Sequence, residues 1–346
     1  MVLQHNDISA KKRIFFIVGS SRSGTTLVSR ILKKHEAVHV LNETHFMEEF
    51  GHERRNFASL TQDQYYRLIN TLLTIQRKDY YRKSEYEEYT QDAKTILADF
   101  QQQTTHDFST LMLTFFRFES GRLGKVHCGD QTPRHVFYIK EMASMFPGAQ
   151  FIHMIRDPRA VLLSQKQKWR AGRKRGQPFF EVLRTRLNYH PITTAIIWKK
   201  SVQAGLNAEK DMPGAKLKAV FFENLVRNPE AVVRMLCSFL GLTFSTNMLA
   251  VDVEMSSSVE LEGETGISRS VAERWRGGLN RTEIFLCEAC AGAMMQELGY
   301  ERIHPRPNLV LLFGYIFTLP FQMTIALLFN LGRMGNPVRY ISKRLF

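Results

Sequence analysis

Residues 13–26 read Arg-Ile-Phe-Phe-Ile-Val-Gly-Ser-Ser-Arg-Ser-Gly-Thr-Thr, and this stretch decides the fold. Its first part, Arg13–Val18, is an apolar run rich in β-forming residues, which is typical of a strand buried on both faces of a sheet. The segment from Gly19 to Thr26 has the glycine spacing of a phosphate-binding loop, and Leu27–Lys34 has the pattern of a helix. Glycines allow a tight turn that directs backbone N–H groups at an anion, and the helix N-terminus adds a favourable dipole. The sequence therefore predicts a strand–loop–helix unit that holds a phosphate.

The chain beyond this unit continues to alternate strands with helices. Further buried strands are predicted at Val38–Leu41, Phe151–Ile155 and Leu217–Phe222. Asp157-Pro158 is predicted to start a helix that runs to about Lys168, and another helix at Pro229–Leu240 ends at Gly241. We predict an α/β fold of the P-loop type, in which a central parallel sheet is flanked by helices.

Two segments depart from this alternation. Residues 61–123, approximately, carry tyrosines among charged residues at helical spacing. We predict a helical insertion there, either as a substrate-binding element or as a structural cap. Residues 305–346 are apolar and basic and are predicted to form a separate hydrophobic helical segment, which leaves residues 1–304 as the main domain.

Composition bounds the partners and the compartment. The chain has 346 residues and a formal net charge of +14, which favours anionic partners. Nucleic acid is not predicted among them, because no recognition motif accompanies the charge. Four cysteines do not make a disulfide framework and suit a reducing compartment. Residues 1–13 contain no apolar run, so no signal peptide is expected and we predict a cytoplasmic location.

The loop differs from that of a nucleoside triphosphatase. Such enzymes need a lysine directly after the second glycine, where this chain has Thr25. Arg22 is the cation available inside the loop. A P-loop nucleotide kinase, with Asp157 as a metal ligand, is an alternative that the missing lysine and the Pro-Arg after Asp157 both oppose. No metal is predicted.

A second motif follows the strand at 151–155, where Arg156 leaves the carboxyl end of the strand and Ser164 comes eight residues later. Carboxyl ends of strands are where α/β sheets bind ligands. With both motifs, the chain resembles the superfamily of sulfotransferases that depend on 3′-phosphoadenosine 5′-phosphosulfate (PAPS). Within it, the loop Arg22-Ser-Gly-Thr-Thr26 resembles the bacterial and protein-tyrosine sulfotransferases.

The resemblance implies which residues bind the donor. The loop residues Ser21, Arg22, Ser23, Gly24, Thr25 and Thr26 would bind the 5′-phosphosulfate of PAPS. Arg156 and Ser164 would hold its 3′-phosphate. The segment Ser268–Leu279 resembles the family's loop that closes over the nucleotide, which makes Arg274 and Arg276 candidates for phosphate contact.

The resemblance also implies a catalytic pair. Arg22 would stabilise charge on the leaving phosphate, and Glu43, in the Glu-Thr pair after the second strand, would be the base that accepts the hydroxyl proton. The alternatives for the base are His45, Glu48 and Glu49, and more weakly His35 and His39.

One position departs from the family pattern, because many relatives have a lysine where this chain has Gln131. Arg22 would then act alone, or with another cation such as Arg134 or Lys125. This departure leaves specificity for tyrosine open.

The predicted function is transfer of a sulfuryl group from PAPS to a hydroxyl of a saccharide, lipid-linked or small-molecule acceptor. A protein-tyrosine sulfotransferase, with a tyrosine peptide as acceptor, is the alternative in the same class. The basic cluster Lys166–Arg175 would receive an acidic acceptor, help to hold the donor, or form only a solvated face.

The segment Leu309–Leu331 is almost wholly apolar and carries Pro320 near its middle. Basic residues flank it on both sides. We predict a kinked hairpin that dips into the cytosolic leaflet of an anionic membrane, with a single membrane span and a buried helical pair as the alternatives.

Overall fold

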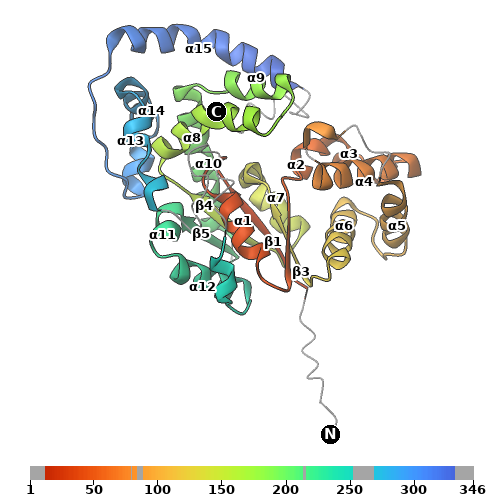
Figure 1. The fold of residues 1–346 in the computed structure, drawn as a ribbon. Coiled ribbons are helices and arrows are strands. Elements are labelled where there is room, and N and C mark those ends of the chain that lie inside the picture. Colours follow the sequence, from red (N-terminus) through yellow and green to blue (C-terminus); the bar gives the residue numbers. More distant parts are fainter. Residues whose placement is uncertain (1–11, 79, 84–88, 213–215, 252–268, 332–346) are drawn as a thin grey trace.

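The structure is a computed structural model that describes residues 12–78, 80–83, 89–212, 216–251 and 269–331 (Figure 1). Its centre is a five-stranded sheet in the order β2-β3-β1-β4-β5, and all four pairings are parallel. The strands are β1 (Ile14–Gly19), β2 (Val38–Leu41), β3 (His127–Gln131), β4 (Gln150–Ile155) and β5 (Leu217–Phe221).

Helices cover both faces of this sheet. In chain order they are α1 (Thr25–Lys33), α2 (Phe46–Glu49), α3 (Gly51–Arg55), α4 (Gln62–Arg77), α5 (Thr90–Gln101), α6 (Phe108–Arg122), α7 (Ile139–Met145), α8 (Pro158–Lys174), α9 (Phe179–Leu187), α10 (Pro191–Asp211), α11 (Phe222–Arg227), α12 (Pro229–Leu240), α13 (Trp275–Gly278), α14 (Arg281–Glu297) and α15 (Leu309–Asn330). Figure 1 shows α4, α5 and α6 grouped at one side of the sheet and α15 running across the top of the molecule.

The central strand β1 divides the core into two layers, because successive side chains of a strand point to opposite faces. Phe16 and Val18 pack in the cluster that includes α4, α5, α6 and α7. Phe15 and Ile17 pack in the other cluster, which includes α1 and α12. All four side chains are buried. With both faces covered, the carboxyl ends of the strands are left as the edge at which polar residues gather.

The predicted parallel α/β fold is confirmed, with one strand missed. The four strands expected near residues 13, 38, 151 and 217 are present, and the helix expected at 229–240 has those bounds, with Gly241 at φ 60° as its C-cap. The missed strand is β3, and α8 continues to Lys174, beyond the expected end near Lys168. The expected helical insertion consists of α4, α5 and α6, while residues 84–88 within it lie outside the described part. The domain boundary near residue 304 stays a prediction.

The expected hairpin at the C-terminal end is wrong, because residues 309–330 form one continuous helix with Pro320 inside it. A proline inside a helix removes one backbone hydrogen bond and favours a kink rather than a reversal of the chain. Most of this helix is exposed, so the alternative of a buried helical pair is also excluded.

One buried histidine makes the stability of the fold depend on pH. His153 on β4 is fully buried against α10, where a Cβ added to Gly205 would lie 2.1 Å from its ring. Burial lowers the pKa of His153 to about 4. The unfolded chain therefore binds more protons below its ordinary pKa near 6.5, and stability is lost as the pH falls from there towards 4.

We expect the free energy of unfolding to fall by about 2 kcal/mol from this residue alone between pH 7 and pH 5. Urea unfolding at both pH values measures the loss. His39, whose pKa burial also lowers to about 4, adds to it in the wild type. His153→Leu should remove the part of the pH dependence that is due to His153 and keep the part that is due to His39. An unchanged pH dependence in this variant would show that His153 does not titrate as assigned.

Candidate functional site

The loop after β1 is shaped by residues with unusual backbone angles. Gly24 has φ 94°, and a Cβ there would lie 2.4 Å from the ring of Phe222. Among the described residues, three that are not glycine have positive φ, namely Arg22 (77°), His45 (52°) and His304 (46°). Left-handed angles cost energy in residues with a side chain and collect at functional sites. Two of these three lie at the carboxyl end of the sheet, where the sequence predicted the site.

The structure joins the two predicted phosphate motifs. The Nε of Arg22 donates a hydrogen bond to Ser164 Oγ at 3.0 Å. Nη1 of Arg156 donates to the carbonyl oxygen of Arg22 at 3.1 Å, and its Nη2 donates to the carbonyl oxygen of Val271 at 3.0 Å. Arg156 thus connects the loop after β1 with the segment before α13, and Ser164 on α8 meets the same loop.

Both arginines are charged groups with limited access to water, since Arg156 is buried and Arg22 is half-buried. Burial and the nearby charge of Arg156 together lower the pKa of Arg22 to about 10, against the opposing effect of Glu43. Burial likewise lowers the pKa of Arg156 to about 10. Two desolvated cations this close repel each other, so a bound anion would stabilise both.

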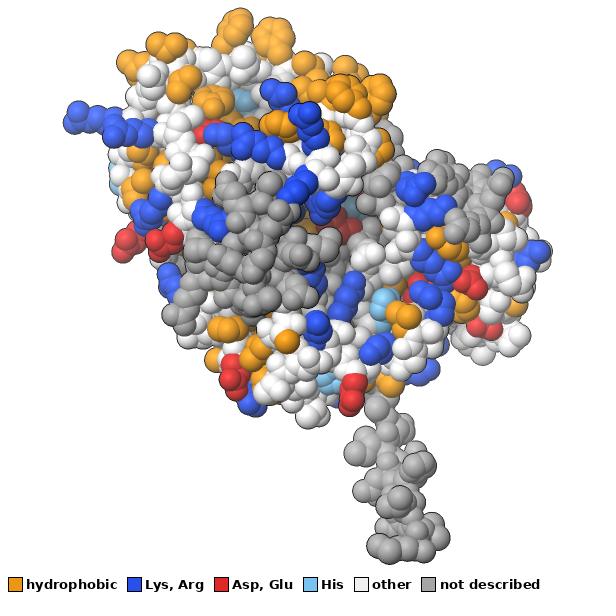
Figure 2. Space-filling model, viewed as in Figure 1, with side chains coloured by type: hydrophobic (Ala, Val, Ile, Leu, Met, Phe, Trp, Pro, Cys, Tyr) orange, Lys and Arg blue, Asp and Glu red, His pale blue; other side chains and the backbone are white. Residues whose placement is uncertain are grey.

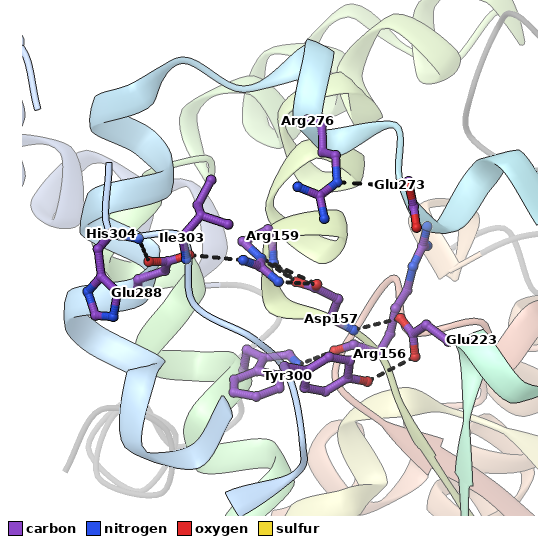
Figure 3. Close-up of polar contacts among 11 residues, drawn as sticks. Arg156, Asp157, Arg159, Glu223, Glu273, Arg276, Glu288, Tyr300, Ile303 and His304 are labelled. Atoms are coloured by element: carbon purple, nitrogen blue, oxygen red, sulfur yellow. Dashed lines mark hydrogen bonds and ion pairs between the residues drawn. The ribbon is translucent and has the colours of Figure 1, made fainter. Parts of the chain in front are cut away.

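The position of Arg156 is fixed from several sides (Figure 3). Its guanidinium lies 4.1 Å from the centre of the Phe222 ring, and its carbonyl oxygen accepts a hydrogen bond of 2.9 Å from Trp198 Nε1. The next residue, Asp157, donates its backbone N–H to Glu223, whose other oxygen accepts from the Tyr300 hydroxyl. These contacts tie the end of β4 to α10, α11 and the segment after α14.

Asp157 itself is bound to Arg159, which argues against the metal-ligand role of the kinase alternative. Its carboxylate accepts hydrogen bonds from the backbone N–H, Nε and Nη2 of Arg159, the last at 2.7 Å. Arg159 also pairs with Glu288 at 2.9 Å (Figure 3). Its guanidinium lies 4.0 Å from the centre of the Trp275 ring. Within the described ranges, no group of three or more His, Cys, Asp and Glu residues could hold a metal ion.

The two arginines predicted to close over the nucleotide lie in different surroundings. Arg274 is half-buried, and its Nη1 has no hydrogen-bond partner among the described residues. Arg276 is exposed, with Nε 3.9 Å from Glu273 (Figure 3). Ser268, the start of the predicted closing loop, lies outside the described residues.

A small cavity of about 70 Å³ lies beside the loop. Its lining combines loop residues with side chains of both charges, namely Ser21, Glu43, His45, Tyr80, Pro133, Arg134, Lys168 and Arg184. A larger cavity of about 460 Å³ lies at the amino end of β5, with Leu217 and Phe239 in its wall, and contains none of the predicted site residues. The smaller cavity is therefore the candidate acceptor pocket.

Glu43 in this pocket is a carboxylate at neutral pH. Burial would raise its pKa, but its hydrogen bond to His45 and the charges of His45, Lys168 and Arg134 outweigh this effect and lower the pKa to about 2. The Nε2 of His45 lies 3.3 Å from Glu43 Oε2. About half of the Glu43 side chain remains exposed, so the carboxylate can reach a bound acceptor.

The neighbouring Thr44 explains why Glu43 lies here. Thr44 is fully buried and its hydroxyl donates a hydrogen bond of 2.6 Å to Asp130 on β3. The other oxygen of Asp130 lies 3.1 Å from Nδ1 of His135. This buried chain of contacts attaches the end of β2 to β3 and holds the adjacent Glu43 at the mouth of the pocket.

The five other candidate bases have three different surroundings. His45 and Glu48 lie with Glu43, and Nδ1 of His45 is 3.8 Å from Glu48 Oε2. Glu49 accepts a hydrogen bond from the Tyr80 hydroxyl and pairs with Lys83. The remaining two lie elsewhere, since His35 follows α1 and His39 lies within β2, and neither lines the pocket.

Lys168 is a candidate for the cation that the sequence left open. Gln131 lies beside the loop as predicted, and its Nε2 donates to Thr25 Oγ1 at 3.1 Å. Lys125 is wrong for this role, because it lies before β3 and bonds to the carbonyl oxygen of Glu36. Lys168 and Arg134 both line the pocket. Burial and the charge of Arg22 lower the pKa of Lys168 to about 8. A lysine at helical spacing from Ser164 was the signal available in the sequence.

A model of the sulfotransferase family matches residues 15–246. The chain belongs to this family. Its relatives include nodulation protein NoeE of Sinorhizobium fredii (strain NBRC 101917 / NGR234), which is 23% identical over 86% of this chain and 68% of that protein. A putative protein-tyrosine sulfotransferase of Caenorhabditis briggsae is 23% identical over 74% of this chain and 75% of that protein. Human carbohydrate sulfotransferase 5 is 29% identical over 45% of this chain and 41% of its own length.

A solved structure shares the fold of this sulfotransferase. The sulfotransferase domain from the curacin biosynthetic pathway has a TM-score of 0.52 and 17% identity, with 84% of this chain and 98% of that domain covered. The chain is therefore an enzyme of sulfuryl transfer, and the kinase alternative is not retained.

The pKa of Lys168 predicts a pH dependence of anion binding. Above about pH 8 its amine loses the charge that attracts an anion, so affinity for 3′,5′-ADP should fall, by about tenfold between pH 7 and pH 9. Calorimetric titration measures the affinity. Lys168→Met should bind more weakly at pH 7 and show a flatter profile.

Lys166→Met is the matched control, because Lys166 lies on the same helix but pairs with Glu283 at 2.8 Å. An identical pH profile in wild type and Lys168→Met would contradict the assignment.

Proposed function

We propose that this sulfotransferase uses PAPS as donor and transfers its sulfuryl group to a hydroxyl of a saccharide, lipid-linked or small-molecule acceptor. The observation that carries the proposal is the contact of Arg22 with both Ser164 and Arg156, which makes one anion site of two motifs. The family implies the same donor. PAPS carries two phosphate groups on one nucleoside, and the site offers two desolvated arginines.

Buried polar atoms without partners support the fit of an anionic donor. Ser23 Oγ, Arg156 Nε and Arg274 Nη1 have no hydrogen-bond partner among the described residues, and Ser23 is fully buried. Buried donors of this kind cost free energy unless a ligand or water bonds to them. Ser23 lies in the loop assigned to the 5′-phosphosulfate, Arg156 in the motif assigned to the 3′-phosphate, and Arg274 in the segment assigned to cover the nucleotide.

The transfer needs a base for the acceptor hydroxyl on one side of the sulfur and a positive group that stabilises the leaving phosphate on the other. The acceptor oxygen bonds to sulfur, the bond from sulfur to the bridging phosphate oxygen breaks, and the electron pair leaves with 3′,5′-ADP. Arg22 would stabilise this leaving charge, and Lys168 and Arg134 would supply the charge that Gln131 lacks. Glu43 would accept the acceptor's proton. With its pKa near 2, the carboxylate takes this proton only when the oxygen has begun to bond to sulfur and has lost basicity.

The acceptor class is inferred from the names of the relatives and from Gln131. The name of carbohydrate sulfotransferase 5 indicates a glycan acceptor, and the name of NoeE indicates a role in nodulation. The putative protein-tyrosine sulfotransferase is a relative of comparable identity. Gln131, in place of the family's lysine, weakens the tyrosine alternative. All four cysteines are free, which supports the cytoplasmic location.

Radiolabelled PAPS tests the function directly. The purified enzyme is incubated with soluble oligosaccharides, lipid-linked saccharides and tyrosine peptides in parallel, and product is separated from PAPS. We expect label on a saccharide-bearing acceptor, and turnover lowered by about 10²–10³-fold in Arg22→Ala. Label confined to the tyrosine peptides would select the alternative, and transfer unaffected by Arg22→Ala would refute the role of Arg22.

Glu43→Gln separates the base from the donor site. The amide keeps the shape of the side chain but accepts no proton, so turnover should fall by about 10²–10⁴-fold while the affinity for 3′,5′-ADP stays unchanged. Rapid-quench kinetics and calorimetry measure the two quantities. Glu49→Gln is the matched control and should retain turnover within a few-fold, because Glu49 is bonded to Tyr80 and Lys83. A loss of nucleotide binding in Glu43→Gln would instead mean that Glu43 is structural.

A further inference from the structure

The helix α15 presents apolar side chains to the surroundings rather than to the protein. It has 22 residues and a mean hydropathy of 1.8 over its most apolar window, none of which is buried. By length and composition it could cross a membrane. Figure 2 shows the hydrophobic side chains gathered along the top of the molecule, where α15 runs in Figure 1. Its most exposed large apolar side chains are Leu309, Val310, Phe313, Phe317, Phe321 and Leu328, at 60–80% exposure.

Two polar side chains of α15, those of Gln322 and Asn330, point the other way, into the protein, whereas Thr318 and Thr324 are exposed and bond to the backbone of the helix itself. Asn330 Oδ1 accepts a hydrogen bond of 3.0 Å from Arg184, and its Nδ2 donates to Asn188. Gln322 donates to the carbonyl oxygens of Leu187 and Tyr189. This arrangement is the reverse of an ordinary surface helix, whose polar face meets water.

The same inward stripe continues to the start of the helix. The carbonyl oxygen of Tyr315 lies 3.1 Å from Nε2 of His190. Asn308, the N-cap of α15, receives a hydrogen bond from Thr282 and donates one back at 2.9 Å. Contacts therefore hold the helix to the domain at its beginning, middle and end, over a length of about 33 Å.

This attachment argues against a membrane span. If α15 crossed a bilayer in this position, α9 and the residues that bond to α15 would enter the hydrocarbon with it. Arg184 and Glu181, which pair at 2.9 Å, would be among them. Charged groups in the hydrocarbon are expensive, and exposed backbone ends there are not tolerated. The helix can instead lie flat, with its outward face in the acyl region and the domain in water.

Neighbouring elements extend the apolar face and add positive charge. Phe179 and Phe180 at the start of α9 are 73% and 72% exposed, and α9 packs against α15. The guanidinium groups of Arg170 and Arg186 lie 5.5 and 5.2 Å from the centre of the Trp169 ring on α8. Aromatic side chains beside exposed arginines are typical of the interface between anionic headgroups and acyl chains.

We propose that the outward face of α15, together with Phe179 and Phe180, docks in the plane of an anionic bilayer. The partner is a lipid surface, because the face is a long apolar ridge with basic residues on the adjoining α8 and α9. This proposal does not depend on the reaction that the enzyme catalyses.

One consequence does rest on the proposed function. Arg184 lines the small pocket that contains Glu43, and it also holds Asn330 of α15. Arg184 therefore connects the acceptor pocket with the inward side of α15, which favours an acceptor whose hydroxyl group is presented at the membrane surface.

Sedimentation with vesicles tests the docking without any measurement of activity. The full chain, diluted from detergent, is mixed with vesicles of phosphatidylcholine containing phosphatidylglycerol, and the bound fraction is measured. We expect partition into vesicles that weakens when phosphatidylglycerol is omitted. Phe179→Ser with Phe180→Ser, and separately Phe317→Ser with Phe321→Ser, should each lower the partition coefficient about tenfold or more. Leu123→Ser, at an exposed leucine outside the proposed face, is the matched control and should change nothing.

The orientation of the helix is tested by the depth of fluorescent labels. Leu311→Cys, Phe321→Cys and Leu328→Cys, each with Cys290→Ser to remove the one cysteine that is not fully buried, receive a fluorophore that lipid-borne quenchers report. A helix in the plane places all three labels at similar shallow depths. A deep central label with shallow ends would mean a span and would overturn the proposal. Protein that stays out of the vesicle pellet and behaves as a dimer in light scattering would also overturn the proposal, because a second copy of the chain would then cover the outward face of α15.

Discussion

The hydrogen bond from Arg156 to the carbonyl oxygen of Arg22 is the contact on which the site depends. It fixes the loop after β1 against the end of β4, and β1 and β4 are adjacent in the sheet. Arg22 then reaches Ser164 on α8, the helix that starts directly after Arg156. Neighbouring parallel strands thus bring two motifs, more than 130 residues apart, to one edge of the sheet. The left-handed conformation of Arg22 is part of the same arrangement.

Positive charge with limited access to water is the second feature of the site, since Arg156 is buried and Arg22 and Lys168 are half-buried. Burial lowers the pKa values of Arg22, Arg156 and Lys168, so each would be more stable beside an anion. Negative partners within the protein are placed for other tasks, since Asp157 is bonded to Arg159 and Glu43 to His45. Desolvated cations of this kind lower stability in the free protein and strengthen the attraction for a polyanionic donor. The cations that bind the donor are therefore already in place in the folded enzyme before the donor binds.

The sequence predicted what local pattern controls and missed what distant contacts control. The apolar runs of β1, β4 and β5 and the loop glycines were sufficient to predict the fold. Strand β3 was not predicted because its sequence, His-Cys-Gly-Asp-Gln, has no apolar run. Distant residues make it a buried strand, since the Phe15 ring fills the space above Gly129 and the Thr44 hydroxyl donates a hydrogen bond to Asp130. Arg184 was missed, and Lys168 was predicted only as one member of the basic cluster Lys166–Arg175, because no spacing rule joins either residue to Glu43. The hairpin predicted in place of α15 was wrong because an apolar composition indicates a membrane-compatible segment but not the path of the chain. Polar contacts such as that between Asn330 and Arg184 decide how the helix lies on the domain.

The central claim is that the loop and Arg156 form a site for a nucleotide with phosphates at both its 3′ and 5′ positions. Calorimetric titration of the purified enzyme with 3′,5′-ADP, 5′-AMP and ATP, without metal and then with Mg²⁺, tests it most directly. The account predicts micromolar binding of 3′,5′-ADP alone, indifferent to Mg²⁺, weakened in Ser164→Ala and lost in Arg156→Ala. Tighter, Mg²⁺-dependent binding of ATP that both substitutions leave unchanged would contradict it.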